Sequence, residues 1–210
     1  AVLTQRDTEL LVDKTIVKVE DTLKAFGDIA KYYKQKYNVP TVSVTGSVGK
    51  TTTKDMLASV LSQKYNTLKT MGNFNNEIGL PITIFGLEKE HEAAVLEMGM
   101  NHFGEIEHLA DIGRPDVAVI TNIGQSHIEN LGSREGIFKA KMEMTKLFTK
   151  DNILVAYTAD EEGYGRLPVE LRTFKAGLLE GSGKKYAFSF EAGNRNEGYK
   201  TASQVNYVAR

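Results

Sequence analysis

Residues 45–53 (TGSVGKTTT) constrain the fold of this chain most, because they place a glycine loop between an apolar run and a helical pattern. The run at residues 42–44 is typical of a buried parallel strand, and apolar residues recur at helical spacing from Met56 to Leu61. A helix that begins directly after such a loop presents free N–H groups to a phosphate. The segment therefore predicts an α/β fold that binds a nucleotide triphosphate.

Each residue type in this loop suits the chemistry of a phosphate. Gly46 and Gly49 let the backbone approach the anion, Lys50 supplies a positive charge, and the Thr51 hydroxyl can ligate magnesium. The loop is short, since only two residues separate its glycines. The alternative, a glycine-rich turn with an incidental lysine, is disfavoured by the flanking strand and helix. We therefore expect ATP and Mg²⁺ as cofactors, bound through Thr45, Gly46, Ser47, Val48, Gly49, Lys50, Thr51 and Thr52.

Composition sets broader limits on the function. With 210 residues, 41% of them hydrophobic, the chain can bury one main α/β core. Its 26 Lys and Arg residues balance 27 Asp and Glu residues, which argues against nucleic acid as a partner. No apolar run approaches the roughly 18 residues of a membrane span. The absence of cysteine fits a cytoplasmic protein.

Strand and helix patterns alternate along most of the chain. This alternation predicts a mostly parallel sheet with helices on both faces. Ligands of such sheets bind beyond the carboxyl ends of the strands, so polar residues there are candidates for the site. The expected strands cover residues 41–44, 67–70, 93–96, 117–121 and 153–156, and the expected helices follow Lys50 and cover residues 104–112 and 134–147.

Three polar residues follow the ends of expected strands. Glu97 can bind magnesium beside the glycine loop, although a solvated strand-end glutamate fits equally well when the residue is taken alone. Asn122 is expected to contact the nucleotide. A neutral imidazole at His127 can ligate a divalent metal, although a loop histidine taken alone is more often structural. For His102, which precedes a helix start, we favour a structural hydrogen-bonding role.

The two ends of the chain differ from its centre. Residues 1–3 and 15–19 read as short strands with little to cover them, and Asp21 can cap a helix that ends by Asn38. We expect residues 1–38 to be the C-terminal remnant of a preceding substrate domain plus a linker helix. Residues 39–210 would form the central ATP-binding domain, with an atypical tail from about residue 157. That tail can supply strands such as 185–190.

Five motifs occur in the order seen in the Mur ligases, and the chain is identified as resembling that family. Lys54 and the asparagine-rich segment most resemble the members that add D-alanyl-D-alanine. The resemblance implies a P-loop NTPase-like Mur ligase central domain. The motifs are residues 45–54 (TGSVGKTTTK), 73–81 (NFNNEIGLP), 97–99 (EMG) with 104–106 (GEI), 121–124 (TNIG) with His127, and 140–141 (AK).

The resemblance implies an ATP-dependent amide ligase of peptidoglycan precursor synthesis. ATP would phosphorylate the terminal carboxylate of a UDP-MurNAc-tripeptide, and the amine of D-alanyl-D-alanine would attack the acyl phosphate. It also implies the role of each site residue. These are Lys50 for the phosphates, Thr51 and Glu97 for a first magnesium, His127 for a second, Lys141 as a carbamylated lysine facing the metal, and Asn75 and Asn76 between nucleotide and acyl substrate.

Complete Mur ligases carry a C-terminal domain that closes over ATP and delivers the amine. We expect that domain to be absent here, because residues 163–210 are too few to form it. We also expect a monomer that forms no amide by itself. Two alternatives stay open: a non-catalytic ATP-binding fragment, and a P-loop switch ATPase. The second would require a strand-borne aspartate and a guanine- or water-positioning motif, which we do not find.

Overall fold

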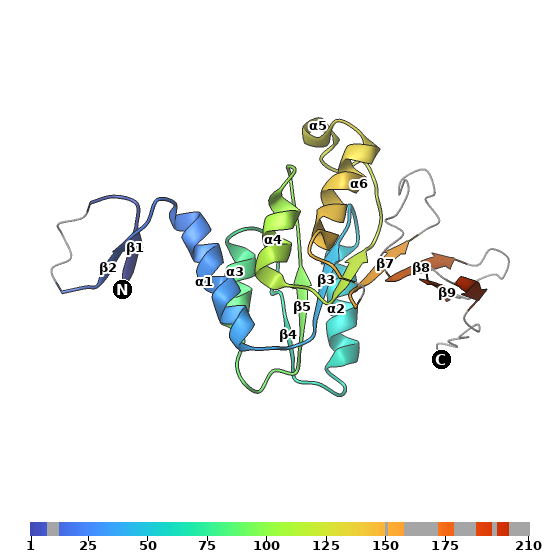
Figure 1. Ribbon diagram of the computed structural model, residues 1–210, viewed down its shortest axis with the longest axis horizontal. Helices are drawn as coiled ribbons and strands as arrows, with labels where there is room; N and C mark the ends of the chain where they lie inside the picture. Colours follow the sequence, from blue (N-terminus) through green and yellow to red (C-terminus); the bar gives the residue numbers. More distant parts are fainter. Residues whose placement is uncertain (8–12, 150, 158–171, 179–187, 195–196, 202–210) are drawn as a thin grey trace.

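The computed structural model describes residues 1–7, 13–149, 151–157, 172–178, 188–194 and 197–201. Its central sheet has the strand order β10-β9-β8-β7-β6-β3-β5-β4 (Figure 1). All pairs from β4 to β8 are parallel, whereas β9 and β10 run antiparallel to their neighbours. The strands are β3 (Thr41–Thr45), β4 (Thr67–Lys69), β5 (Ala93–Glu97), β6 (Val117–Ile120), β7 (Ile153–Tyr157), β8 (Arg172–Leu178), β9 (Phe188–Asn194) and β10 (Glu197–Thr201).

Helices cover both faces of this sheet, and the alternation of side chains along the strands explains why. Val44 and Val95 pack against Ala58 of α2 (Lys50–Leu61) on one face. Their neighbours Ala94 and Leu96 point the other way, into a larger core. The expected α/β class is thereby confirmed. The larger core is built with α1 (Thr22–Lys36), α3 (Gly79–Phe85), α4 (Glu105–Gly113) and α6 (Arg134–Met142).

The central strand β3 brings three loops to one edge of the sheet. It pairs with β5 on one side and β6 on the other, with Val44 opposite Glu97 and Thr45 opposite Ile120. Because these strands are parallel, their carboxyl ends lie together. The loops that follow β3, β5 and β6 therefore meet, and they carry the polar residues singled out from the sequence.

Three helical segments differ from the sequence-based expectation. Neither α3 nor the short α5 (Ile128–Leu131) was expected. Proline disfavours the interior of a helix, but Pro81 lies in the first turn of α3. The backbone N–H groups of a first turn have no acceptor within the helix, so the missing N–H group of proline costs no helical hydrogen bond. The expected helix at 134–147 ends at Met142 and tightens into η1 (Glu143–Thr145). There the Thr145 hydroxyl donates to the Met142 carbonyl and competes with the α-helical pattern.

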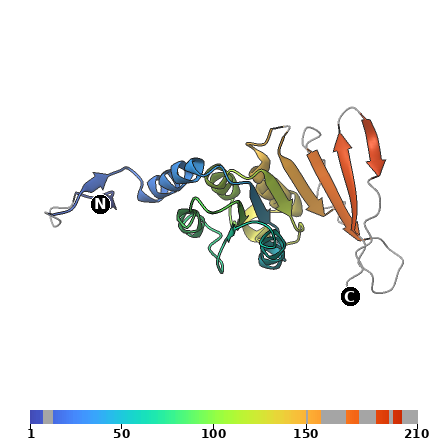
Figure 2. The same ribbon diagram turned by 90° about the horizontal axis from the view of Figure 1, so that it is seen from below.

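The N-terminal segment lies apart from the sheet, at the outer end of α1 (Figures 1 and 2). It forms a parallel pair of β1 (Val2–Thr4) and β2 (Ile16–Lys18). The Asp21 carboxylate caps α1 as expected, accepting the N–H groups of Leu23 and Lys24. The reading of residues 1–38 as a domain remnant plus linker stays a prediction.

The C-terminal strands extend the sheet beyond β7. Strand β8 pairs in parallel with β7, and β9 and β10 continue from it. The expected strand at 185–190 corresponds in part to β9, which begins at Phe188, and residues 185–187 lie outside the described residues. None of the helices in the described part of the chain is long and apolar enough to cross a membrane.

Candidate ATP-binding and metal site

The segment after β6 holds the glycine loop in place. Asn122 Oδ1 accepts the N–H groups of Ser47 and Val48, each at 3.0 Å. The Gly124 N–H donates to Ser47 Oγ at 2.8 Å, and the Thr121 hydroxyl donates to the Val48 carbonyl at 2.6 Å. These hydrogen bonds to one neighbouring segment hold the loop in place.

Two glycines are required by the geometry of this loop. Gly46 has a φ of 152°, and a Cβ at this position would lie 1.8 Å from Thr121 Oγ1. Gly49 adopts the left-handed conformation, with a φ of 83°, and forms the N-cap of α2. Asn122 accepts the Ser47 and Val48 N–H groups, and the N–H groups of the first turn of α2 are suited to bind a phosphate.

A cavity of about 220 Å³ opens beside the loop. Lys50 reaches it from α2, His127 from the N-cap of α5 and Lys141 from α6. Side chains far apart in the sequence thus share one space. The cavity is lined by Thr45, Gly46, Lys50, Asn75, Asn76, Gly99, Met100, Asn101, Glu105, His127 and Lys141.

The two lysines of this cavity influence each other. Lys50 Nζ donates to the Gly46 carbonyl at 2.9 Å, and burial lowers its pKa while the negative charge of Glu97 opposes that effect. The Lys141 side chain is almost fully buried, with 2% exposure. Burial first, and then the positive charge of Lys50, lower the pKa of Lys141 to about 8. Near neutral pH, Lys141 therefore carries a larger fraction of neutral, nucleophilic amine than an exposed lysine.

Glu97, the last residue of β5, is buried and does not line the cavity, but it contacts Asn75, which does. Its Oε1 accepts a hydrogen bond of 2.8 Å from Asn75 Nδ2, and its N–H donates to Thr70 Oγ1 at 2.9 Å. Its Oε2 has no hydrogen-bond partner within the part of the chain that the structure describes, and Lys54 Nζ lies 4.0 Å away. A buried carboxylate oxygen without a donor is suited to a cation.

The donor set fits magnesium better than a metal held wholly by the protein. Within the described residues, no group of three or more His, Cys, Asp or Glu side chains could hold a metal ion. Magnesium needs less, since it keeps several waters and takes one or two carboxylates together with substrate phosphates. Glu97 Oε2 and the hydroxyl of Thr51, which is exposed at the start of α2, match that requirement.

His127 lies in a strained backbone conformation. Its φ of 65° places it in the left-handed region, which few residues other than glycine adopt. Such strain is concentrated at functional sites. His102, by contrast, is exposed and its ring hydrogen-bonds to Glu105, so its contacts agree with the structural role favoured from the sequence.

Sequence reasoning assigned no role to several residues of the cavity. Glu105 lies within the motif at 104–106, but only the structure shows that it lines the cavity and accepts the Asn101 N–H at 2.7 Å. The signal for Glu105 was its position at a helix start close to Glu97 in the sequence.

Asn76, which is expected at the substrate, has a second contact. Its side chain accepts the Gly79 N–H at 2.8 Å and so helps to begin α3.

Comparison with known protein families identifies the family to which the chain belongs. The sequence profile of the Mur ligase middle domain matches residues 44–205. The chain belongs to the Mur ligase family. Three of the five Mur ligase motifs supply Lys50, His127 and Lys141 to one cavity, and a fourth supplies Asn75 and Asn76.

Curated relatives of this Mur ligase chain are named UDP-N-acetylmuramoyl-tripeptide–D-alanyl-D-alanine ligase. That of Bacillus subtilis is 51% identical over 146 residues, which cover 70% of this chain and 32% of the relative. That of Escherichia coli is 41% identical over 155 residues, covering 74% and 34%. The chain thus spans about a third of the length of these relatives.

A solved structure of a related Mur ligase has the same fold. The MurF ligase of Thermotoga maritima, in complex with ADP, superimposes with a TM-score of 0.78 and is 34% identical. The match covers 91% of this chain and 47% of that protein.

Proposed function

We propose that this chain provides the ATP-binding centre of a ligase that joins D-alanyl-D-alanine to a UDP-MurNAc-tripeptide. The main support for this proposal is that Lys50, His127 and Lys141 line one cavity. Asn75 and Asn76 line it as well. The names of the relatives support the reaction, and the ADP complex of the Thermotoga maritima protein supports the nucleotide. The expected reaction places the protein in the cytoplasm, where ATP is available.

In this proposal, the nucleotide phosphates bind between Lys50 and the first turn of α2. The lysine ammonium and the N–H groups of that turn offer charge and donors without a change in the loop. Asn122 acts on the nucleotide indirectly, because its side chain holds Ser47 and Val48. Of the remaining loop residues, Thr45 and Gly46 line the cavity, and Gly49 and Thr52 would contact the nucleotide beside it.

Thr51 and Glu97 would hold a first magnesium, and His127 would help to hold a second. Magnesium would supply charge neutralisation during transfer of the γ-phosphoryl group. Lys141 would serve as a carbamate formed with carbon dioxide, and its burial and lowered pKa favour the neutral amine that this modification needs. Asn75 and Asn76 would lie between the phosphates and the acyl substrate.

The chemistry then depends on positioning more than on covalent help from the protein. Phosphoryl transfer needs the acyl carboxylate in line with the γ-phosphate, and the amine must then reach the acyl phosphate. The amide groups of Asn75 and Asn76 can orient the carboxylate. Asn75, which lines the cavity, donates a hydrogen bond to Glu97 and so orients its carboxylate.

Calorimetric titration with magnesium-ATP tests the proposal. Lys50→Ala should weaken binding roughly 10- to 100-fold, since a hydrogen bond to a charged group contributes about 1.5–3 kcal/mol. The matched control is Lys64→Ala, which removes an exposed lysine just beyond the end of α2 and should leave the affinity unchanged. Equal affinity of the wild type and Lys50→Ala would refute the assignment of the loop.

A further inference from the structure

Lys54 is a buried lysine that the proposed reaction leaves without a role. It lies on α2, one turn after Thr51, and its side chain is 2% exposed. Residues three apart share one face of a helix, so Lys54 points to the same side as the Thr51 hydroxyl. Burying an ammonium is costly, and an apolar residue of similar size would pack there without that cost. A reason other than packing is therefore needed.

The contacts of Lys54 connect it to the candidate metal ligand. Its Nζ lies 4.0 Å from Glu97 Oε2 and 3.4 Å from Asp55 Oδ1. Asp55 in turn pairs with Lys69 Nζ at 2.8 Å, on β4. On the far side, Glu97 Oε1 accepts from Asn75 at 2.8 Å. Charges of alternating sign thus run from the surface of β4 to the Glu97 carboxylate.

In this arrangement each oxygen of the Glu97 carboxylate has its own neighbour. The Asn75 amide donates to one oxygen, and the Lys54 ammonium lies 4.0 Å from the other, which has no hydrogen-bond donor among the described residues. Asn75 belongs to the loop after β4, whereas Lys54 belongs to the helix that begins at the glycine loop. The orientation of the carboxylate therefore depends on the position of α2.

We propose that Lys54 is a positioning residue that balances the charge of Glu97 and holds its carboxylate toward the magnesium site. The inference rests on the proposed function, since it assumes that Glu97 binds the metal. It adds that α2 carries both Lys50, which would bind the phosphates, and Lys54, which would be the counter-ion of Glu97. Lys54 touches neither nucleotide nor substrate in this role.

The test is calorimetric titration of ADP over a series of magnesium concentrations and, separately, in EDTA. Lys54→Met should raise the magnesium concentration for half-maximal effect about 10-fold, the scale found for residues that orient metal ligands. ADP binding in EDTA should change less than about twofold. Lys54→Gln, which keeps a polar head group without the charge, should shift the magnesium requirement in the same direction and serves where the methionine variant unfolds.

The matched control is Lys34→Met. Lys34 is also a buried lysine, with 6% exposure, but it lies near the end of α1 and donates to the Val39 carbonyl. Its loss should leave the magnesium requirement unchanged, even if it changes stability. A magnesium requirement of the Lys54 variants that is unchanged, or lower than that of the wild type, would overturn the proposal.

A second measurement separates this inference from the proposed function. In a ¹⁵N-resolved NMR spectrum, the side-chain amide of Asn75 reports its hydrogen bond to Glu97. That resonance should move in Lys54→Met and stay in place in Lys34→Met, without any nucleotide present. Absence of nucleotide binding in the wild type would contradict the proposed function, whereas an unmoved Asn75 resonance would contradict the role of Lys54 alone.

Discussion

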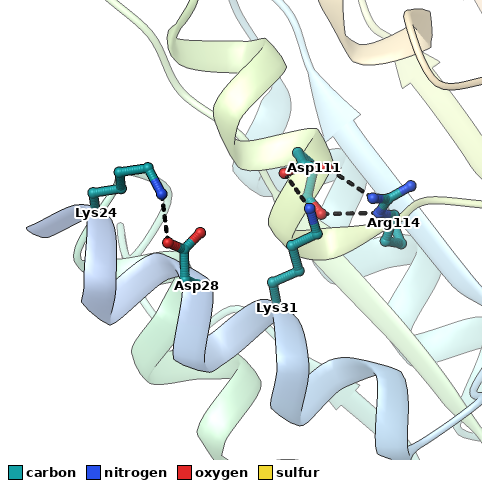
Figure 3. Close-up of polar contacts among 5 residues, drawn as sticks. All are labelled: Lys24, Asp28, Lys31, Asp111 and Arg114. Carbon is teal, nitrogen blue, oxygen red and sulfur yellow. Dashed lines mark hydrogen bonds and ion pairs between the residues drawn. The ribbon is translucent and has the colours of Figure 1, made fainter.

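Two sets of lysines in this molecule lie in opposite environments. On α1, Lys24 pairs with Asp28 at 2.6 Å, and Lys31 pairs with Asp111 of α4 at 2.7 Å (Figure 3). The first pair is exposed and the second is partly exposed. At the candidate site, Lys54 and Lys141 are 2% exposed. Among the described residues, Lys54 Nζ has no carboxylate oxygen nearer than that of Asp55, at 3.4 Å.

The comparison shows that a short distance does not measure the energetic importance of a charge. Exposed pairs contribute little, because water screens them and their side chains lose entropy on pairing. Buried lysines are costly unless they are well paired. The α1 pairs are therefore expected to contribute little to stability, whereas Lys54 and Lys141 are buried at a cost that the proposed function would explain.

The largest expected effect comes from the titration of Lys141. Its pKa falls from 10.5 to about 8 on folding, a change of about 2.5 units or about 3 kcal/mol. Below pH 8 both states are protonated, and the full cost of burial is present. As the pH rises from 8 to 10.5 the folded state loses its proton first, so the free energy of unfolding should rise.

Urea unfolding of the wild type and of Lys141→Met at pH 7.5 and pH 10 measures this term. At pH 7.5 the methionine variant should have the higher free energy of unfolding, because it avoids the cost of burying a charge. This difference from the wild type should shrink by up to about 3 kcal/mol at pH 10. Lys139→Met, an exposed neighbour on α6, is the control and should show no such change. A pH-independent difference between Lys141→Met and the wild type would mean that folding does not lower the pKa of Lys141.

Glu143 should show the next largest effect, as a buried charge that is well satisfied. Both of its carboxylate oxygens accept the Gly104 N–H at 2.9 Å, at the N-terminus of α4. Glu143→Ala should lower the free energy of unfolding by about 2 kcal/mol. Glu135→Ala, on the exposed face of α6, should leave it unchanged. Equal stability of the two variants would remove the distinction between buried and exposed carboxylates.

Replacing His127 by glycine should stabilise the protein. The left-handed backbone costs about 1–2 kcal/mol for an ordinary residue, and part of the gain is offset by the flexibility of glycine in the unfolded state. A net gain of about 0.5–1 kcal/mol is expected in thermal or urea unfolding. Arg114 is also left-handed, but Arg114→Gly loses the ion pair with Asp111 and should gain less. A loss of stability in His127→Gly would show that its side chain contributes more than its strain costs.

The smallest expected effect is that of the partly exposed ion pair between α1 and α4. Lys31→Met should lower the free energy of unfolding by less than about 1 kcal/mol, and the difference should decline with added salt. Urea unfolding at low and high ionic strength measures it. A larger, salt-independent loss would mean that this contact anchors α1 more strongly than its exposure indicates.

The sequence predicted the fold class because the relevant signals are local. Strand, loop and helix around Lys50 follow from adjacent residues, and the strand pattern is confirmed to within about one residue from β3 to β7. Helix α3 was missed, because Pro81 disfavours a helix except in its first turn. The extent of α6 was wrong, because Thr145 competes for a helical carbonyl.

The candidate site was predictable in its residues and not in its contacts. Lys50, His127 and Lys141 could be named from motifs, and the structure places them in one cavity. That Asn122 holds the glycine loop, or that Lys54 lies behind Glu97, depends on packing between segments about 40 to 75 residues apart. No local pattern encodes such contacts.

The hydrogen bonds from Asn122 to the glycine loop also bear on how fast a nucleotide can associate. A loop that must order itself around its ligand spends most of its time in forms that cannot bind, and the observed affinity falls by that fraction. Here the Asn122 side chain accepts the N–H groups of Ser47 and Val48, so residues of the protein itself hold the loop. Association should therefore be a single second-order step whose observed rate rises linearly with nucleotide concentration, with no slower ordering phase that saturates.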